Sequence, residues 1–491
     1  MDQESPPRQT RISIFRNWIC LCGLIVAGGS MFAFLLLFIL DALAPVSNPY
    51  VGILAYLIAP GFFVTGFLMV AVGLLIERRQ LKKQGPGSTI PVLIVDLSRS
   101  RDRKNLILLS SAALVFMVIT AVGSYRSYHF TESVEFCGQA CHTVMQPEFT
   151  TYMHSPHARV ACSQCHIGPG AEWYVKAKIS GLHQVYAVMR SSYEKPISTP
   201  IKNLRPAQET CEQCHWPNKF VGNIDRTYRH YLSDTNNTPF AVRLLLKVGG
   251  SDPNHGPVGG IHWHMNVGNK VEYIASDEQR QVIPWVRVTD AQGVVTEYKT
   301  SKFKPDSKQV IRKMDCMDCH NRPAHNYQVP DDAVDLAMSL SRIDPGIPSI
   351  KKEAVKVLTR QYANETEALQ KIATELAEKY PDDPRIRPAI EAVQQIYRDN
   401  FFPEMKANWK VYPSNIGHKN WSGCFRCHDG EHLASDGKRT IKANDCNACH
   451  IILAQGAGAE LEQLNSKGQE FKHPGGDYGE MKCSDCHTGG D

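Results

Sequence analysis

The most apolar part of the chain lies near its N-terminus. Three runs there, at about residues 17–44, 51–76 and 105–124, are long enough to cross a hydrocarbon core of roughly 30 Å as helices. The first run is far longer than the roughly 7–15 apolar residues of a signal peptide, which favours a retained helix over a cleaved leader. We therefore expect a membrane anchor over residues 1–124 with three transmembrane helices.

Basic residues are unevenly placed around these runs. Residues 45–50 carry no charged side chain, whereas residues 77–104 include eight Lys or Arg. By the positive-inside rule, the N-terminus and this basic loop face the cytoplasm. Three spans then put everything after about Tyr125 on the other side of the membrane. In a bacterium this arrangement is a multi-pass inner-membrane protein whose large domain lies in the periplasm.

Two stretches beyond the anchor have regular patterns. A β-rich insert is predicted over residues 221–315 from four short apolar or alternating runs. These runs are residues 241–248, 270–275, 282–288 and 294–298. Helical periodicity at residues 350–380 and 388–400 predicts a helical insert. The expected architecture after the anchor is a mostly α-helical and loop domain that contains these two inserts.

Composition limits the class of protein. With 491 residues, 43% of them hydrophobic and 21% charged, the chain is too apolar for wholesale disorder. Its net charge of +5 gives no bulk attraction for nucleic acid, and none is expected as a partner. The 16 cysteines are too few for a disulfide miniprotein and too many for chance, so their spacing has to be explained.

Fourteen cysteines form seven pairs, and each pair is followed directly by a histidine. Two thiols at this spacing can form thioethers with both vinyl groups of one haem, and the adjacent imidazole can then bind the iron. The predicted thioether residues are Cys137, Cys141, Cys162, Cys165, Cys211, Cys214, Cys316, Cys319, Cys424, Cys427, Cys446, Cys449, Cys483 and Cys486. The predicted proximal ligands are His142, His166, His215, His320, His428, His450 and His487. Only the first motif has an extra residue between its thiols.

Two other uses of paired cysteines fit less well. Zinc ribbons need a second pair to complete four ligands and do not require a histidine after each pair. Structural disulfides suit the periplasm but do not repeat as a two-residue loop with a fixed histidine. Cys20 and Cys22 lie in the first apolar run without a histidine and are interpreted as small apolar residues of a helix.

Seven haem c groups, numbered here by the order of their motifs, are therefore expected. Haems 1–3 fall within residues 125–220, haem 4 within residues 316–423, and haems 5–7 within residues 424–491. Twelve of the 19 histidines remain for distal positions, enough for mostly bis-histidine haems suited to electron transfer. The candidate distal ligands are His157, His262, His264, His325, His418, His432 and His473, with Met145 for haem 1.

Some histidine assignments stay open. His262 and His264 are two residues apart and would point to opposite sides of a strand, so one or both could serve haems 3 and 4. A solvated or hydrogen-bonded role is at least as good an interpretation for the remaining histidines. These are His129, His154, His230 and His255.

The first two motifs resemble those of the NapC/NirT family of membrane-anchored quinol dehydrogenases. The resemblance rests on Cys-Gly-Gln-Ala-Cys-His-Thr-Val-Met at residues 137–145 and on Ser-Pro-His-Ala-Arg-Val-Ala-Cys-Ser-Gln-Cys-His at residues 155–166. It covers about residues 105–220. The later haems, the three spans and the length are similar only to the larger multihaem members found in metal-respiring bacteria.

The resemblance implies menaquinol oxidation beside haem 1, with a lysine and an acidic group on the helix after the second motif. Lys176 or Lys178 could take the lysine's part, but neither has its spacing, and Gln184 stands where the acid is expected. His183 then becomes the candidate proton acceptor, because quinol oxidation releases protons and histidine titrates near neutral pH. A distal haem ligand is an equally good interpretation of His183.

These observations favour a menaquinol-oxidising heptahaem cytochrome of the inner membrane. Its electrons would pass to periplasmic c-type cytochromes or a reductase in anaerobic or extracellular metal respiration, and the chain could also self-associate. One alternative is an electron-relay subunit without its own quinol site. Another is a terminal reductase with an open haem, which would need a haem without a distal ligand beside basic residues.

Overall fold

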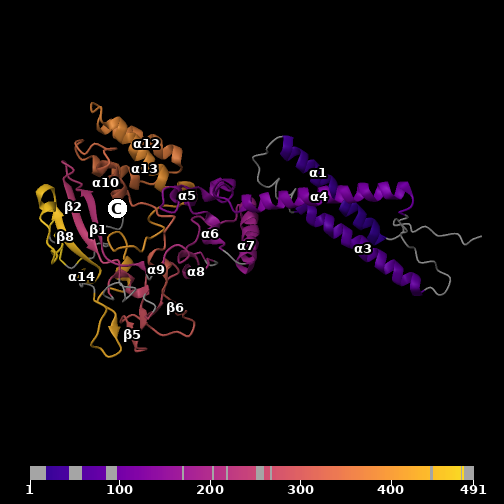
Figure 1. The fold of residues 1–491 in the computed structure, drawn as a ribbon. Helices are drawn as coiled ribbons and strands as arrows, with labels where there is room; N and C mark the ends of the chain where they lie inside the picture. The colour runs from indigo at the N-terminus through magenta and orange to yellow at the C-terminus, as the bar shows by residue number, and fades with distance from the viewer. Residues whose placement is uncertain are drawn as a thin grey trace, which may run out of the picture. The chain divides into compact units, whose positions relative to one another are not determined.

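The computed structural model describes residues 18–43, 58–83, 97–168, 171–201, 204–216, 219–249, 259–265, 268–442, 446–476, 478–479 and 481. The chain divides into two compact units after Cys141. The first unit contains the long N-terminal helices, and the second contains the sheets and the remaining helices (Figure 1).

The first unit begins with two long apolar helices, α1 (Trp18–Leu43) and α3 (Ala59–Lys83). Both are long and apolar enough to cross a membrane. They pack closely because small residues face each other, and a Cβ on Gly66 would lie only 2.6 Å from the backbone nitrogen of Ala27. Cys20 is fully buried on α1, as expected for a small apolar residue of a helix. The third helix, α4, spans Ser100–Thr131 and includes the third predicted span.

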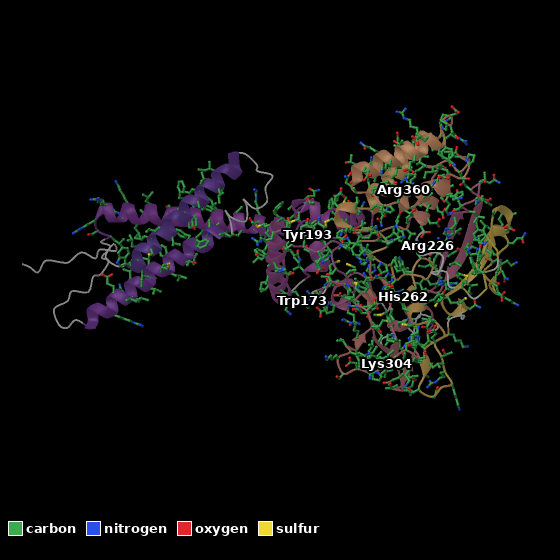
Figure 2. The ribbon with its side chains drawn as sticks, turned by 180° about the vertical axis from the view of Figure 1, so that it is seen from behind. Trp173, Tyr193, Arg226, His262, Lys304 and Arg360 are labelled. Atoms are coloured by element: carbon green, nitrogen blue, oxygen red, sulfur yellow. The ribbon has the colours of Figure 1, made fainter. Side chains whose placement is uncertain are left out.

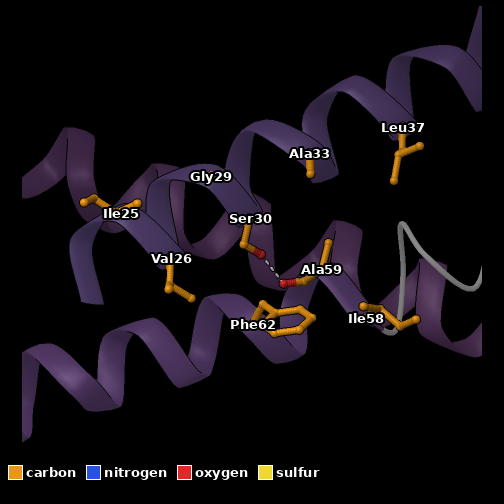
Figure 3. A pocket seen from close by; sticks show the side chains of 9 residues that line it. All are labelled: Ile25, Val26, Gly29, Ser30, Ala33, Leu37, Ile58, Ala59 and Phe62. Carbon is orange, nitrogen blue, oxygen red and sulfur yellow. Dashed lines mark hydrogen bonds between the residues drawn. The ribbon is translucent and has the colours of Figure 1, made fainter. Parts of the chain in front are cut away.

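An apolar groove of about 370 Å³ lies between α1 and the start of α3. Its wall includes Ile25, Leu37 and Phe62, and Figure 3 shows these side chains around it. The hydroxyl of Ser30 donates a hydrogen bond to the carbonyl of Ala59. The groove could therefore hold a hydrocarbon chain. None of its lining side chains could accept a proton from a quinol headgroup.

The largest core of the second unit is helical. It is built on α10 (Pro330–Ser339), α11 (Ile350–Thr359), α12 (Glu365–Lys379) and α13 (Ile386–Asn400). The helical insert is confirmed, but the run predicted at 350–380 is divided in two. Asn364 begins α12 as its N-cap and accepts a hydrogen bond from the backbone N–H of Glu367.

Two antiparallel sheets lie in the same unit. One has the order β1 (Ile224–Tyr231), β2 (Pro239–Leu246) and β8 (His450–Gly456), which Figure 1 shows side by side. The other has the order β6 (Arg312–Lys313), β3 (Lys270–Ile274), β4 (Trp285–Thr289), β5 (Val295–Lys299) and β7 (Leu433–Ala434). The four predicted runs overlap β2, β3, β4 and β5. The strands β7 and β8 come from beyond the predicted insert, so both sheets also include C-terminal residues.

Candidate haem centres

Three cysteine motifs have both thiols on one short helical turn: α6 (Cys162–His166), α9 (Cys316–Cys319) and α14 (Cys446–Cys449). In two more, a short helix carries only the first cysteine: α8 (Ala207–Cys211) ends at Cys211, and η8 (Gly423–Arg426) ends one residue before Cys427. Residues three apart on such a turn lie on one side of it, which brings two thiols to the same surface. On α9 the turn is fixed by a capping box between Asp315 and Asp318. None of the described cysteines forms a disulfide.

The first motif differs in its helix as well as in its spacing. Residues Phe136–Ala140 form a π-helix, η3, and Cys141 follows it directly. A π-helical turn holds one more residue than an α-helical turn. The extra residue between Cys137 and Cys141 is therefore accommodated by a wider turn.

Five proximal histidines lie opposite a second histidine. The ring centres are 6.0 Å apart for His157–His215, 6.3 Å for His166–His325, 6.3 Å for His262–His320, 5.9 Å for His264–His428 and 6.2 Å for His418–His450. Two imidazoles bound to opposite sides of one metal ion, each at about 2 Å, have ring centres about 6 Å apart. The spacing of all five pairs therefore fits an iron between the rings.

The second histidine of each pair is held in a suitable orientation. Nδ1 hydrogen-bonds a backbone carbonyl in four of them: Pro323 for His157, Val248 for His262, Ile261 for His264 and Glu148 for His325. A proton on Nδ1 leaves the lone pair on Nε2, the nitrogen that can bind a metal. The backbone thus selects the tautomer that iron needs.

Burial keeps several of these imidazoles neutral. Removal from water lowers the pKa of His166 to about 4, and the neighbouring His325 adds to the shift. Burial also lowers the pKa of His264, His320, His325, His418, His428 and His450. Metal binding requires the neutral imidazole, so these histidines are in the required protonation state.

The paired histidines 262 and 264 lie on a 3-10 helix, η6 (Ile261–Met265), and not on the strand that sequence analysis expected. Figure 2 labels His262. They still point to different partners, because His262 pairs with the haem 4 motif and His264 with the haem 5 motif. The expected partners, haems 3 and 4, are thus replaced by haems 4 and 5.

The geometry of His432 does not support its predicted role as a distal ligand. This residue is fully buried, and both ring nitrogens have protein partners. Nδ1 lies 2.8 Å from the carboxylate of Asp429, and Nε2 lies 2.8 Å from the carbonyl oxygen of Ile283. His432 therefore connects the loop after the haem 5 motif to the segment before β4, a structural role.

The ligand sets of haems 1 and 7 stay predictions. Met145 lies on α5 (His142–Met153), three residues after His142. Nδ1 of His473 accepts a hydrogen bond from the backbone N–H of Gly475, so in the neutral imidazole the proton lies on Nε2. Metal binding through Nε2 would require this hydrogen bond to break. The seventh motif, with Cys483, Cys486 and His487, lies outside the described residues.

Neighbouring motifs in the chain are also neighbours in space. α6 contacts α8, and α8 contacts α9. Where α8 meets α9, the thiols of Cys211 and Cys316 are within hydrogen-bonding contact. The binding motifs of haems 2, 3 and 4 therefore follow one another in space as they do in sequence.

A buried cluster of charged and aromatic residues lies beside these motifs, and sequence analysis missed it. Tyr327 donates a short hydrogen bond to the carboxylate of Glu148 on α5. Burial raises the pKa of Glu148, although this bond and the charge of Arg322 oppose the shift. The guanidinium of Arg322 lies 4.2 Å from the ring centre of Tyr412. Its Nε and Nη2 atoms are buried without a hydrogen-bond partner in the described part of the chain.

The two buried nitrogens of Arg322 that have no hydrogen-bond partner among the described residues indicate whether a haem fits beside this cluster. A buried N–H without an acceptor costs about 1–3 kcal/mol. Arg322 lies between His320 of the fourth motif and His325, which faces His166. A haem propionate would supply the missing acceptor, since guanidinium groups bind carboxylates in a fork. No sequence pattern marks such an arginine, because only the fold removes it from water.

The residues predicted for quinol oxidation lie on α7 (Ala171–Met189). Lys176 and His183 are two turns apart and share one face of the helix. His183 and Gln184 are exposed, Lys178 is half-buried, and the ammonium of Lys176 lies 4.8 Å from the ring centre of Trp173. An adjoining apolar strip is 54–80% exposed and consists of Val175, Ile179, Leu182, Tyr186 and Met189. The helix thus presents basic and titratable groups beside an apolar surface.

A second polar cluster contains His230, Asp332 and Asp335. Nδ1 of His230 lies 3.0 Å from a carboxylate oxygen of Asp335. Lys351 lies 2.7 Å from the other oxygen of Asp335, and Lys419 lies 2.6 Å from Asp332. Two ammonium groups already neutralise these carboxylates, so the cluster is an ion-pair network.

Comparison with known proteins agrees with this chemistry. Residues 99–208 match the NapC/NirT cytochrome c family, N-terminal region. The chain is 42% identical over 481 residues to the cytochrome c-type protein ImcH of Geobacter sulfurreducens, covering 94% of this chain and 92% of that protein. It is 30% identical over 94 residues to the cytochrome c-type protein NrfH of Wolinella succinogenes, covering 18% of this chain and 52% of that protein. No solved structure matches the chain significantly.

The long match to ImcH includes both the anchor and the later cysteine motifs, so the likeness is not confined to the first haem sites. The seven cysteine pairs are consistent with seven haem c groups. The chain therefore belongs to the NapC/NirT family of multihaem c-type cytochromes and is an ImcH-like member of it.

Proposed function

We propose that this protein oxidises menaquinol at the inner membrane and passes the electrons through seven haems to periplasmic c-type cytochromes or a reductase. The acceptor would serve anaerobic or extracellular metal respiration. The observation that carries the proposal is the set of five facing imidazole pairs in a chain whose N-terminal helices can anchor it in a membrane. Paired imidazoles make an electron relay, and the anchor gives access to a lipid-soluble donor.

A third membrane span supports the periplasmic placement. Residues 106–122 of α4 contain no charged side chain, and Leu108, Leu114 and Met117 are 59–72% exposed. Such a helix surface needs an apolar environment, which a bilayer provides. Under this proposal α4 is a third span beside the two candidate spans in α1 and α3, and the positive-inside rule would then place the second unit across the membrane from the basic loop.

The imidazole pairs favour a relay over a terminal reductase. A reductase needs an iron with a free coordination position for its substrate. At each of the five described pairs, the second imidazole would take the coordination position that a substrate would need. Arg322 would hold a propionate, and the paired imidazoles would hold the irons. When bound, each haem accepts and passes on one electron.

Residues of α7 would handle the protons. Oxidation of one quinol to quinone breaks two O–H bonds and releases two electrons and two protons. The electrons reduce two ferric irons, and the protons must leave towards the periplasm. His183 is the group of α7 proposed to accept a proton, and Lys176, two turns earlier on the same face of the helix, or Lys178 would orient the quinol oxygen.

Two substitutions test the proposed quinol site, His183→Gln and Lys178→Met. Each lipid-reconstituted variant is mixed with a reduced menaquinol analogue, and haem reduction is followed by stopped-flow absorbance. We expect His183→Gln to slow quinol-driven reduction by about 10²-fold, as for loss of a general base. Reduction by dithionite should be unchanged. Lys302→Met, at an exposed turn of the second unit, is the matched control.

The results distinguish an error in the location of the quinol site from an error in the proposed function. Unchanged quinol-driven rates in both variants would show that the site is not on α7. Failure of the unaltered protein to be reduced by quinol would instead favour a relay subunit without its own quinol site.

A further inference from the structure

The two residues between the cysteines of the haem 5 motif contact two different neighbouring sites: Arg426 contacts the haem 4 motif, and Phe425 contacts His418, which faces the proximal histidine of haem 6. Arg426 is 8% exposed. Its guanidinium donates hydrogen bonds to three backbone carbonyls: Gly423 at 2.8 Å, Arg280 at 2.9 Å and Asp318 at 2.6 Å. Asp318 lies between the two cysteines of the haem 4 motif. A buried charge of one motif is therefore bonded to the backbone of another.

Both the carboxylate and the backbone carbonyl of Asp318 accept hydrogen bonds from several residues. Its carboxylate accepts hydrogen bonds from Arg280 at 3.0 Å and from the hydroxyl of Tyr273. Its carbonyl accepts a second bond from the side-chain amide of Asn415 at 3.0 Å. Asp318 is 4% exposed, and hydrogen bonds in such a buried network reinforce one another. A substitution of Arg426 would therefore alter the hydrogen bonds that hold α9, the turn that carries the haem 4 cysteines.

Phe425 faces the other neighbour. Its ring stacks on the imidazole of His418, with 4.2 Å between the ring centres and 16° between the planes. His418 is the partner of His450, the proximal histidine of the haem 6 motif. Nδ1 of His418 is buried without a hydrogen-bond partner among the described residues, so ring stacking takes part in orienting this imidazole.

We propose that the haem 5 motif couples its two neighbours in the electron path. Arg426 sets the reduction potential of haem 4 together with that of haem 5, and Phe425 sets the imidazole orientation at haem 6. The guanidinium charge favours the ferrous state, which has one positive charge fewer than the ferric state. The proposal rests on the ligand pairs of the proposed function and does not depend on the quinol site.

The test compares Arg426→Met with Phe425→Leu in the full, haem-loaded protein. Reduction by dithionite with redox mediators is followed by electron paramagnetic resonance (EPR). The single variants His262→Met and His418→Met identify the signals of haems 4 and 6. We expect Arg426→Met to lower the potentials of haems 4 and 5 and leave haem 6 unchanged. Phe425→Leu should alter the haem 6 signal and leave haem 4 unchanged.

Each variant is thus the control for the other. A shift confined to haem 5 in Arg426→Met, or the same set of shifted haems in both variants, would overturn the proposal. If Arg426→Met fails to incorporate all its haems, Arg426→Gln decides, because glutamine removes the charge but keeps a side-chain amide that can still donate to a backbone carbonyl. An unchanged haem 4 potential in Arg426→Gln would also overturn the proposal. Because dithionite supplies the electrons, failure of the quinol site would not affect these results.

Discussion

The imidazole rings of His262 and His320 are parallel to within 2°, with their centres 6.3 Å apart. The rings of His264 and His428 have almost the same separation but cross at 84°. The angle between axial imidazole planes controls the EPR spectrum of a low-spin ferric haem. Parallel rings give a rhombic spectrum, and perpendicular rings give one strongly anisotropic low-field signal. As proposed iron ligands, the two histidines of one short 3-10 helix would therefore give two electronically different haems.

We expect both kinds of signal in the oxidised protein. His264→Met should remove the strongly anisotropic signal of haem 5 and raise the potential of that haem, because a thioether ligand favours the ferrous state. The His157–His215 rings cross at 67°, so a second signal of this type, from haem 3, should remain. The rhombic signal of haem 4 should remain. Loss of the rhombic signal instead would contradict the assignment of His262 and His264.

Arg322 should raise the reduction potential of haem 2. Replacement by Met removes a buried positive charge and its bonds to a propionate, so the potential of haem 2 should fall. The fall is on the order of 40 mV for each kcal/mol by which Arg322 stabilises the ferrous state more than the ferric state. A spectroelectrochemical titration measures the shift. Arg342→Met, an exposed arginine of the same unit, should have no effect; equal shifts in both variants would count against the propionate role.

Lys351 should be important for stability. Its side chain is 4% exposed and forms ion pairs with Asp331 at 3.1 Å and Asp335 at 2.7 Å. Lys351→Met leaves the buried carboxylate of Asp335 without its main cation, and we expect a loss of about 3–5 kcal/mol in the free energy of unfolding. Urea unfolding measures this loss. Adding Asp335→Asn should recover part of it, and a double variant less stable than Lys351→Met would argue against this explanation.

The acid stability of the protein should depend on Asp332. Burial raises the pKa of this carboxyl group, but the ammonium of Lys419 outweighs burial and leaves the pKa below its usual value. The ionised carboxylate then contributes stability that is complete above the unfolded pKa of about 3.9 and is lost as the pH falls through the folded pKa. Below about pH 4, the free energy of unfolding should fall less steeply with falling pH in Asp332→Asn than in the unaltered protein. Identical pH profiles would exclude this contribution.

Local patterns predicted a large part of the structure. The positions of β3 and β5 and of α13 follow from their own apolar periodicity, and the cysteine motifs from their spacing alone. β1 was missed because four of its eight residues, among them Asp225 and Arg226, are charged or His, which hides the strand pattern. β8 was missed because it pairs with β2, which lies some 200 residues earlier.

The partner of each proximal histidine could not be predicted, although five of the candidate distal histidines do face a proximal histidine. His157 lies closest in sequence to the second motif, yet it faces His215 of the third. His325 follows the fourth motif but faces His166 of the second. These choices depend on how segments far apart in the chain fold together, and no local spacing contains that information.

The most direct test is stopped-flow absorbance of the lipid-reconstituted protein mixed with a reduced menaquinol analogue, with and without a quinol-site inhibitor. The account predicts fast, inhibitor-sensitive reduction of haem, which then spreads to further haems of the same chain. Haems that dithionite reduces but quinol does not would contradict the claim that this cytochrome oxidises quinol.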